Sequence, residues 1–398
     1  MTEPTNSTNN GWVELCITLA IQATASMALL TLPAAAPVVG ASIGVSPALI
    51  GVFIGLVYIG CIAGSLGAGA AIARWGAIRV SQAGLVGGAA GLLLCCTGAL
   101  PAIVLGALVM GLGYGPITPA SSHLLIRNTP PQRLSLVFSV KQTGVPLGGL
   151  LAGAIAPSLM LALGWREGLL CIALACLACA AAAQPLRRTL DAQRQPATPL
   201  GLGQLAAPMR MVLAHGRLRS LAIVSMFLSA VQLTVTSYSV IYLHVELGYG
   251  LIAAGLALSV CQAAGMVGRI AWGQLADSAL GARRTLMVLT SVVIACCVAT
   301  ALLPAGAPMP WVLVLLAVFG ATAIGWNGVV LAEIARLAPA GGAGLATGGA
   351  SALTFIGVVA GPPVFSLVAS LSGSYRHAYL ALALLVAWCL VRQLRAAR

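Results

Sequence analysis

Apolar runs of about twenty residues recur from one end of this chain to the other, and each is long enough to cross a lipid bilayer as a helix. Only 7% of the 398 residues are charged and 60% are hydrophobic, whereas soluble proteins carry about 25% charged residues. The 47 glycines suit close packing between helices in lipid. The sequence therefore predicts an all-α integral membrane protein.

The apolar runs predict twelve transmembrane helices, divided six and six by one long polar connection. We expect spans at residues 13–39, 47–73, 80–100, 102–126, 134–160, 167–186, 220–245, 251–276, 285–304, 311–335, 345–370 and 378–394. The expected parts of the chain are a polar tail (1–12), a six-helix bundle (13–186), a central loop (187–219), a second six-helix bundle (220–394) and a basic tail (395–398). Residues 202–213 of the central loop are expected to form an amphipathic helix on the membrane surface. The first tail has no Lys or Arg, so we expect the first run to be retained as a span and not cleaved as a signal peptide.

The basic residues indicate which side of the membrane each loop occupies. With the N-terminus in the cytoplasm, sixteen of the twenty Lys and Arg residues lie on the cytoplasmic side, Arg166 and Arg376 lie outside, and Lys141 and Arg269 lie within spans. The sixteen are Arg74, Arg79, Arg127, Arg133, Arg187, Arg188, Arg194, Arg210, Arg217, Arg219, Arg283, Arg284, Arg336, Arg392, Arg395 and Arg398. This bias predicts that both termini and the central loop are cytoplasmic, and we expect the protein in a bacterial inner membrane.

Several classes of function are disfavoured by how charged and reactive residues are distributed. The net charge of +13 comes from residues at the ends of apolar runs, so a nucleic-acid partner is not expected. The eleven cysteines lie almost entirely within apolar runs, where Cys behaves as a small hydrophobic residue, and we expect no disulfide, metal or other cofactor. His123, His215, His244 and His377 are scattered, which argues against a membrane enzyme. No G-x-x-x-x-G-K-[ST] loop is present, so ATP is not expected to drive any reaction.

The two halves of the chain repeat each other. Gly111, Arg127, Pro130 and Gly148 recur as Gly320, Arg336, Pro339 and Gly357, and each pair is 209 residues apart (320 − 111, 336 − 127, 339 − 130, 357 − 148). A constant offset over four positions predicts two bundles related by an axis along the membrane normal.

Two loops that follow the second and eighth spans carry a recognisable motif. Residues 69–79 read GAAIARWGAIR and residues 273–284 read GQLADSALGARR. Both resemble the loop motif G-x-L-A-D-R-x-G-R-R of the major facilitator superfamily, although Ala73 stands where the family has an acid. Together with the twelve spans, the resemblance implies two bundles that rock around a central cavity. It also implies that Asp277 holds a neighbouring helix N-terminus across the cytoplasmic gap, in favour of an outward-open state.

Shorter strings narrow the resemblance. Residues 137–149 (VFSVKQTGVPLGG) and 325–333 (GWNGVVLAE) are similar to transporters of small anions and organic acids, including the cyanate and nitrate type. Residues 143–149 also resemble the fifth-span motif G-P-x-x-G-G of drug–proton antiporters, with Val145 inserted. We therefore expect a monomeric secondary transporter of a small anionic solute, driven by protons or by exchange. A drug or metabolite efflux antiporter of the same superfamily is the alternative.

Lys141 is the leading candidate for a binding residue. It lies eight residues past Arg133, which places it about 12 Å into its span, and a charge there is costly unless it has a function. Its repeat counterpart is Ala350 (350 − 141 = 209), so the fold does not require a charge at this place. No Asp or Glu occurs between Glu14 and Glu167, which disfavours a site for organic cations in this half. The alternative is a structural lysine balanced by Glu333.

Other polar residues within the spans complete the prediction. Candidates for substrate binding besides Lys141 are Gln142, Gln22, Tyr58, Tyr114, Gln232, Tyr238, Gln262, Trp326 and Asn327. Candidates for gating or coupling are Arg74, Arg79, Arg269, Asp277, Arg283, Glu333, Arg336 and His123. Arg269 could equally contact substrate, and Glu333 is as compatible with a proton site as with a gate salt bridge. A lone histidine such as His123 is more often structural than titrating.

Overall fold

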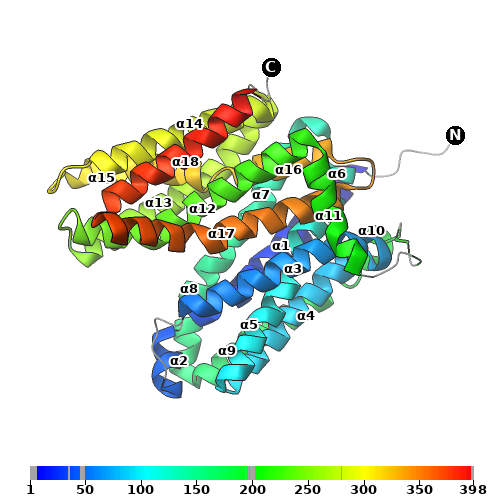
Figure 1. Cartoon of the computed structure of the whole chain (residues 1–398). Helices are drawn as coiled ribbons and strands as arrows, with labels where there is room; N and C mark the ends of the chain where they lie inside the picture. The colour runs from blue at the N-terminus through cyan, green and yellow to red at the C-terminus, as the bar shows by residue number, and fades with distance from the viewer. Residues whose placement is uncertain are drawn as a thin grey trace. The chain divides into compact units, whose positions relative to one another are not determined.

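The predicted spans fold as helices in the computed structural model, which describes residues 7–34, 36–44, 50–192, 194–195, 197, 202–278 and 280–395 (Figure 1). Within these residues the regular structure is entirely helical. Residues 1–6 of the expected N-terminal tail, residues 396–398 of the basic tail and part of the central loop lie outside the described residues.

The first half of the chain supplies nine helices to the described structure and one 3₁₀ turn. They are α1 (Ser7–Ala34), α2 (Ala36–Ile43), α3 (Ile50–Trp75), α4 (Ala77–Cys96), α5 (Leu100–Tyr114), α6 (Ile117–Asn128), η2 (Pro131–Arg133), α7 (Leu134–Gln142), α8 (Gly144–Leu163) and α9 (Trp165–Ala182). The central loop contributes α10 (Arg187–Leu190) and α11 (Leu202–Ala214). The amphipathic segment predicted at 202–213 is therefore a helix.

The second half repeats the pattern with α12 (Gly216–Val245), α13 (Leu251–Ser278), α14 (Gly281–Leu302), α15 (Met309–Ala323), α16 (Asn327–Leu337), α17 (Ala343–Ser372) and α18 (Tyr375–Arg395). Among the described residues, eleven segments are long and apolar enough to cross a membrane, and each falls on an expected span. The twelfth expected span, 378–394, falls on α18, whose apolar part, Tyr375–Val391, is shorter than the others.

Both the fourth and the tenth expected spans are interrupted inside the apolar run. The fourth is divided into α5 and α6 at Gly115 and Pro116, where proline has no N–H to continue the helical hydrogen bonds. The tenth is divided into α15 and α16 over residues 324–326, at the positions 209 residues further on. Such interruptions persist in a membrane only where side chains satisfy the freed backbone groups.

At each interruption, a side chain of a neighbouring helix donates a hydrogen bond to a freed backbone carbonyl oxygen, and the arrangement is the same in both halves. Ser65 Oγ on α3 donates to the carbonyl oxygen of Gly115 at 3.0 Å. Arg269 Nε on α13 donates to the carbonyl oxygen of Ile324 at 3.1 Å. The two donors are 204 residues apart and the two acceptors 209 apart (269 − 65, 324 − 115), so the interruptions are equivalent features of the repeat.

The glycines that defined the repeat also occupy equivalent contacts. Gly111 on α5 lies against the backbone of Val57 on α3, and Gly320 on α15 lies against the backbone of Cys261 on α13. Gly148 on α8 faces the carbonyl oxygen of Ala23, while Gly357 on α17 faces that of Met226. None of the four positions has room for a side chain, because each would meet backbone atoms. The internal repeat predicted from the sequence is thus present in the helix packing.

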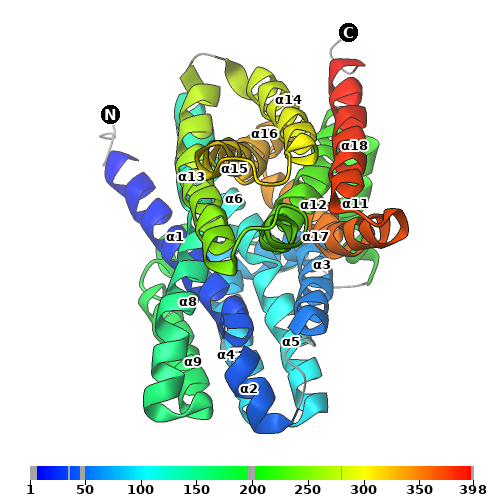
Figure 2. The same ribbon diagram turned by 90° about the vertical axis from the view of Figure 1, so that its left-hand side faces the viewer.

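The chain divides into two compact units. Each unit contains most of one half of the sequence together with a short segment from the other half. Unit 1 consists of Met1–Pro130, Lys141–His215 and Ile334–Ala352, and unit 2 of Pro131–Val140, Gly216–Glu333 and Leu353–Arg398. In unit 1, α1 packs on α8, and α4 lies beside α5 and α9 (Figures 1 and 2). In unit 2, α13 packs on α15, and α14 lies beside α18. Each unit is described by itself below.

Candidate functional site

A buried lysine ammonium lies at the centre of the polar residues of unit 1. Lys141 is 1% exposed, and its Nζ donates to Gln22 Oε1 at 2.7 Å and to Gln142 Oε1 at 3.0 Å. Thr118 Oγ1 lies 3.5 Å from the same nitrogen. The three acceptors are uncharged side-chain oxygens, and they orient the ammonium. We call Lys141, Gln22, Thr118 and Gln142 the lysine cage.

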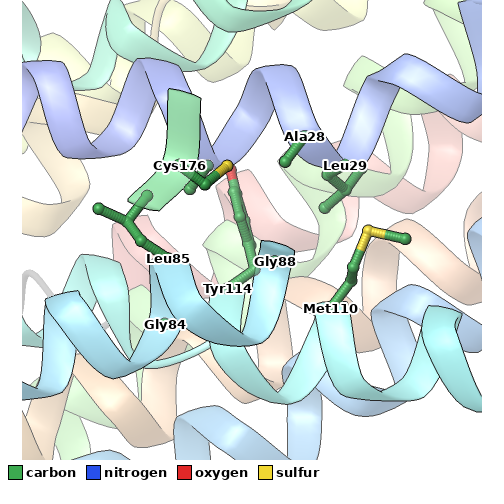
Figure 3. A pocket seen from close by; sticks show the side chains of 9 residues that line it. Ala28, Leu29, Gly84, Leu85, Gly88, Met110, Tyr114 and Cys176 are labelled. Atoms are coloured by element: carbon green, nitrogen blue, oxygen red, sulfur yellow. The ribbon is translucent and has the colours of Figure 1, made fainter. Parts of the chain in front are cut away.

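Gln22 connects the cage to a second group of polar side chains. Its Oε1 accepts from Lys141 and from Thr118 Oγ1, while its Nε2 donates to Tyr114 Oη at 2.9 Å. Ser26, one turn further along α1, lies 3.2 Å from the same Tyr114 hydroxyl. The orientation of the Gln22 amide is therefore set by its partners, because Oε1 faces the donors Lys141 and Thr118 while Nε2 faces the acceptor Tyr114. Tyr114 rises from α5 toward α1, beside a small pocket with otherwise apolar walls that include Ala28, Leu85 and Met110 (Figure 3).

The local sequence explains how the cage is assembled. α7 ends at Gln142 and α8 begins at Gly144, so Lys141 and Gln142 lie in the last turn of a short helix. Gly144 lies against Gln22 and Leu19 of α1, at a distance that leaves no room for a side chain. Thr118 lies in the first turn of α6, immediately after the interruption at Gly115 and Pro116. The cage is therefore formed by helix ends and by one close approach between helices.

Unit 2 holds a polar cluster of its own. Asn327 Nδ2 donates to Gln232 Oε1 at 3.1 Å, Thr354 Oγ1 donates to Ser225 Oγ at 2.9 Å, and Ser229 Oγ donates to the carbonyl oxygen of Thr354 at 2.7 Å. Two of these residues are repeat counterparts of the cage. Asn327 corresponds to Thr118 (327 − 118 = 209), and Ser225 corresponds to Gln22 (225 − 22 = 203). The second half thus retains the polar positions of the cage, with Ala350 in place of its lysine.

The remaining substrate-binding candidates are in varied surroundings. Tyr58 on α3 is half-buried, and Gln262 on α13 is exposed. Trp326 is 1% exposed, and its indole N–H has no hydrogen-bond partner among the described residues. Tyr238 packs in an aromatic cluster, with its ring centroid 5.1 Å from that of Phe365 and 6.2 Å from that of Tyr375. The structure joins Gln142, Gln22 and Tyr114 to Lys141, and Gln232 to Asn327.

Asp277 has the clearest arrangement among the gating candidates. Its Oδ1 accepts from the backbone N–H of Ser135 at 3.1 Å, and its Oδ2 accepts from that of Leu136 at 2.8 Å. These two N–H groups lie in the first turn of α7, where a helix leaves its donors unsatisfied and favours a negative charge. Gly273, one turn earlier on α13, lies against Ser135 and Ser139 of the same helix. The carboxylate therefore caps the helix that carries Lys141 in its last turn.

The loop that lacks the motif acid obtains a carboxylate from elsewhere. Asp191 of the central loop accepts from the backbone N–H groups of Ile78 at 2.9 Å and of Arg79 at 3.0 Å, in the first turn of α4. Gly76 has φ +92° and leaves no room for a side chain beside Asp191. Burial raises the pKa of the Asp191 carboxyl above its usual range, and the backbone N–H groups oppose this rise. Unlike Asp277, Asp191 caps a helix of its own half.

The other gating candidates are less enclosed, apart from Arg269. Arg269 is 2% exposed, and its bond to Ile324 stabilises the interruption of the tenth span. Glu333 lies 3.7 Å from Arg217, whose side chain is 74% exposed, a type of surface pair that contributes little to stability. Arg283 is exposed, and so is Arg79, whose guanidinium donates to Gln82 at 3.4 Å. Arg74, His123 and Arg336 are half-buried.

Thr118 and Asp191 were not identified by the sequence analysis. Thr118 is four residues past Tyr114, a helical spacing that could have pointed to it. Asp191 lies more than a hundred residues from the helix that it caps, and no local pattern announces such a contact. Among the described residues, no group of three or more His, Cys, Asp or Glu could hold a metal ion.

Comparison with known proteins identifies the family. Residues 15–362 match the sequence model of the Major Facilitator Superfamily. An uncharacterised MFS-type transporter of Mycobacterium tuberculosis is 25% identical over 255 residues, which cover 64% of this chain and 56% of the relative. Monocarboxylate transporter 13 of Rattus norvegicus is 25% identical over 256 residues, covering 62% of this chain and 56% of the relative. The match thus spans little more than half the length of these relatives.

Solved structures show the same fold over nearly the whole chain. The Escherichia coli fucose:proton symporter superposes with a TM-score of 0.73 at 18% identity, covering 97% of this chain and 98% of that one. The human organic anion transporter MFSD10 gives a TM-score of 0.73 at 17% identity, covering 98% of this chain and 100% of that one. The prediction from the loop motifs is confirmed: this chain belongs to the major facilitator superfamily, whose members are membrane transporters and not enzymes.

Proposed function

We propose that the protein is a secondary active transporter that moves a small anionic solute by alternating access, either with protons or by exchange. The observation that carries the proposal is the lysine cage. A fully buried ammonium donates to the amide oxygens of Gln22 and Gln142, and no Asp or Glu occurs between Glu14 and Glu167. An anion that reaches Lys141 would gain a charge-assisted hydrogen bond, and Gln142 and Thr118 would orient it.

A carboxylate is the anion that we favour. Two proteins similar to this chain are named a monocarboxylate transporter and an organic anion transporter, which supports an organic acid as substrate without determining it. The strings at 137–149 and 325–333 resemble small-anion transporters as well. The six-plus-six division, the monomeric state and the inner-membrane location are parts of the same proposal.

A ligand screen tests the substrate class directly. The purified protein is heated with L-lactate, pyruvate, acetate, cyanate or nitrate, and with lipophilic cations as probes of the efflux alternative. A solute at 100 times its Kd raises the free energy of unfolding by about 2.7 kcal/mol. We expect at least one anion to raise the melting temperature and the cations to leave it unchanged. Stabilisation by cations alone would favour the efflux antiporter.

The topology predicts where reporter fusions are active. A reporter fused after Arg398 should be active only if it is of the kind that functions in the cytoplasm, because sixteen of the twenty basic residues lie on that side in the predicted topology. A fusion after Gly306, in the connection between α14 and α15, should show the opposite behaviour. Periplasmic activity of the fusion at Arg398 would contradict the proposed orientation.

Asp277→Asn should weaken the outward-open state. The amide offers one oxygen where the carboxylate offers two, so one N–H of α7 loses its acceptor and the helix loses its counter-charge. A cap of this kind is worth about 1 kcal/mol, or roughly fivefold in the balance between states. We expect slower labelling, by about this factor, of a Gln262→Cys variant by an impermeant thiol reagent added outside.

Ser278→Ala is the matched control for this prediction. Ser278 is the exposed neighbour of Asp277, and its hydroxyl donates only to the carbonyl oxygen of Gln274 on its own helix. Labelling should be unchanged in this variant. The same rate in wild type and in Asp277→Asn would leave Asp277 as a helix cap without a role in gating.

A further inference from the structure

Four buried polar residues form a stripe along α1 that leads to the lysine cage. Glu14, Thr18, Gln22 and Ser26 follow one another at intervals of four residues, so they lie on one face of the helix. Each is at most 2% exposed. Gln22 belongs to the cage, and Glu14 lies eight residues before it, about 12 Å along the helix axis. The stripe therefore places a buried acid two turns from Gln22, which accepts the hydrogen bond of the buried lysine.

The Glu14 carboxyl is only partly satisfied. Asn128 Nδ2 donates to its Oε1, while its Oε2 is buried and has no hydrogen-bond partner among the described residues. A carboxylate inside an apolar span is costly, and more so with an unsatisfied oxygen. Binding a proton removes the charge and leaves the bond from Asn128 in place, because the carbonyl oxygen of the neutral acid still accepts. The site can thus exist in two protonation states without rearrangement.

A single short helix connects Glu14 with the cage. α6 is separated from α5 by the interruption at Gly115 and Pro116, and both of its ends contact α1. At its start, Thr118 donates to Gln22 Oε1 at 3.3 Å, and at its end, Asn128 donates to Glu14. A change of charge at Glu14 therefore acts on the helix that also carries Thr118 of the cage.

We propose that Glu14 is a proton-binding site coupled to the anion at Lys141. The proposal rests on the function proposed above and specifies its coupling residue. A negative solute in the cage is repelled by an ionised Glu14, whereas a proton on Glu14 removes the repulsion. At a separation of about 12 Å and an effective dielectric constant of about 20, the repulsion between two unit charges corresponds to roughly a tenfold change in affinity. The solute should therefore bind roughly tenfold more tightly when Glu14 is protonated than when it is ionised. Because coupling is reciprocal, the anion favours proton binding by the same factor, which is the requirement for symport.

Other charged groups on the neighbouring helices are consistent with this assignment. The acids and bases on the helices that pack against α1 are Arg74, Arg79, His123, Arg127, Arg166 and Glu167, while α2, α5 and α8 have none. Among them, Arg127 is the neighbour of Asn128, and its guanidinium attracts an ionised Glu14 carboxylate. Its exposed position keeps this attraction partly screened by solvent.

Infrared difference spectroscopy tests the proton site without any substrate. Lowering the pH from about 8 to about 5 should produce the C=O stretching band of a protonated buried carboxyl in the wild type. The Glu14 component of this band should be lost in Glu14→Gln, which keeps the acceptor for Asn128, whereas any component from the buried Asp191 should remain. The Glu14 component should remain in Glu167→Gln, the matched control, because Glu167 is exposed at the start of α9. A band of the same intensity in Glu14→Gln as in the wild type, or its absence from the wild type, would overturn the proposal.

Coupling is measured by two further experiments. Lys141→Gln should raise the midpoint pH of the Glu14 band by about one unit, because it removes the positive charge bound to Gln22 and so destabilises the Glu14 carboxylate. An unmoved midpoint would refute the coupling.

The second experiment measures uptake of L-lactate or pyruvate into proteoliposomes. An inward proton gradient should accelerate this uptake about tenfold in the wild type. It should not accelerate uptake in Glu14→Gln, although this variant should still exchange the solute. If neither solute is transported by the wild type, the proposed substrate class fails, while the infrared result still decides the role of Glu14.

Discussion

Lys141→Ala should lower anion uptake by about a hundredfold or more while the protein still inserts and folds. The expected loss corresponds to about 3 kcal/mol, within the range for removing one partner of a buried charge pair. Folding should persist, because a lysine inside a span costs about 2.5–3.5 kcal/mol on insertion scales, and the substitution removes that cost. Gln22 retains its bonds to Tyr114 and Thr118 after the change, so the polar network is not left without partners. Uptake into proteoliposomes and the melting temperature are the two measurements.

Lys141→Arg separates charge from geometry. The guanidinium keeps the positive charge, but its planar fork is larger than the ammonium that fits between Gln22 and Gln142. We expect a solute that still binds, with a Kd raised about tenfold. Ser81→Ala is the control, since it removes a buried hydroxyl of α4 that donates to Ala77 of its own helix. It should leave uptake unchanged.

Two results would contradict the anion-site hypothesis. The first is wild-type uptake in Lys141→Ala. The second is rescue of that variant by Glu333→Gln, because rescue would mean that Lys141 serves to balance an acid and not to bind solute. In the absence of both, loss of solute binding together with an unchanged melting temperature would assign Lys141 to the substrate.

The positions of the helices were predictable because their cause lies in short stretches of sequence. Each apolar run is a local property, and the sequence alone placed the spans within a few residues of the helix bounds. The interruptions inside the fourth and tenth spans were not predicted. Pro116 marks the first of them, but the apolar pattern continues through residues 324–326, where the interruption is stabilised by Arg269 from another helix. An interruption held by a distant side chain leaves little trace in its own sequence.

Some residues of the candidate site could likewise be identified from local sequence, whereas others could be identified only from the packing of the helices. Lys141 could be identified from its sequence alone, because a charge inside an apolar run is rare and costly. Its partners Gln22 and Thr118 lie 119 and 23 residues away, and only the packing of α1 and α6 brings them to the ammonium. Asp191 was not identified from the sequence for the same reason, because it contacts a helix more than a hundred residues away. Glu14 was visible only as the limit of a stretch without acids, and its burial and its bond to Asn128 required the structure.

Gly148→Leu should be the most destabilising of the substitutions considered. A Cβ at this position would meet the carbonyl oxygen of Ala23, the Cβ of Ser26 at 2.5 Å and the backbone nitrogen of Met27 at 2.7 Å. Backbone atoms of α1 cannot move aside as a flexible side chain would, so α8 would have to separate from α1, which carries Gln22 of the cage. Overpacking of this kind costs about 3 kcal/mol or more. We expect the melting temperature in detergent to fall by about 5 °C or more, and solute binding to be lost with it.

Gly153→Leu on the same helix is the matched control. Nothing lies within 4 Å of a Cβ built at Gly153, so the same side chain should change the melting temperature by about 1 °C or less. Gly357→Leu supplies the second comparison, because Gly357 meets Met226 and Ser229 of α12 as Gly148 meets Ala23 and Ser26 of α1. If the repeat determines how both halves pack, the two leucine variants should lose similar stability, and Gly153→Leu should lose almost none. A Gly148→Leu protein as stable as Gly153→Leu would show that α1 and α8 can separate without cost, and the close approach that forms the cage would then have no structural role.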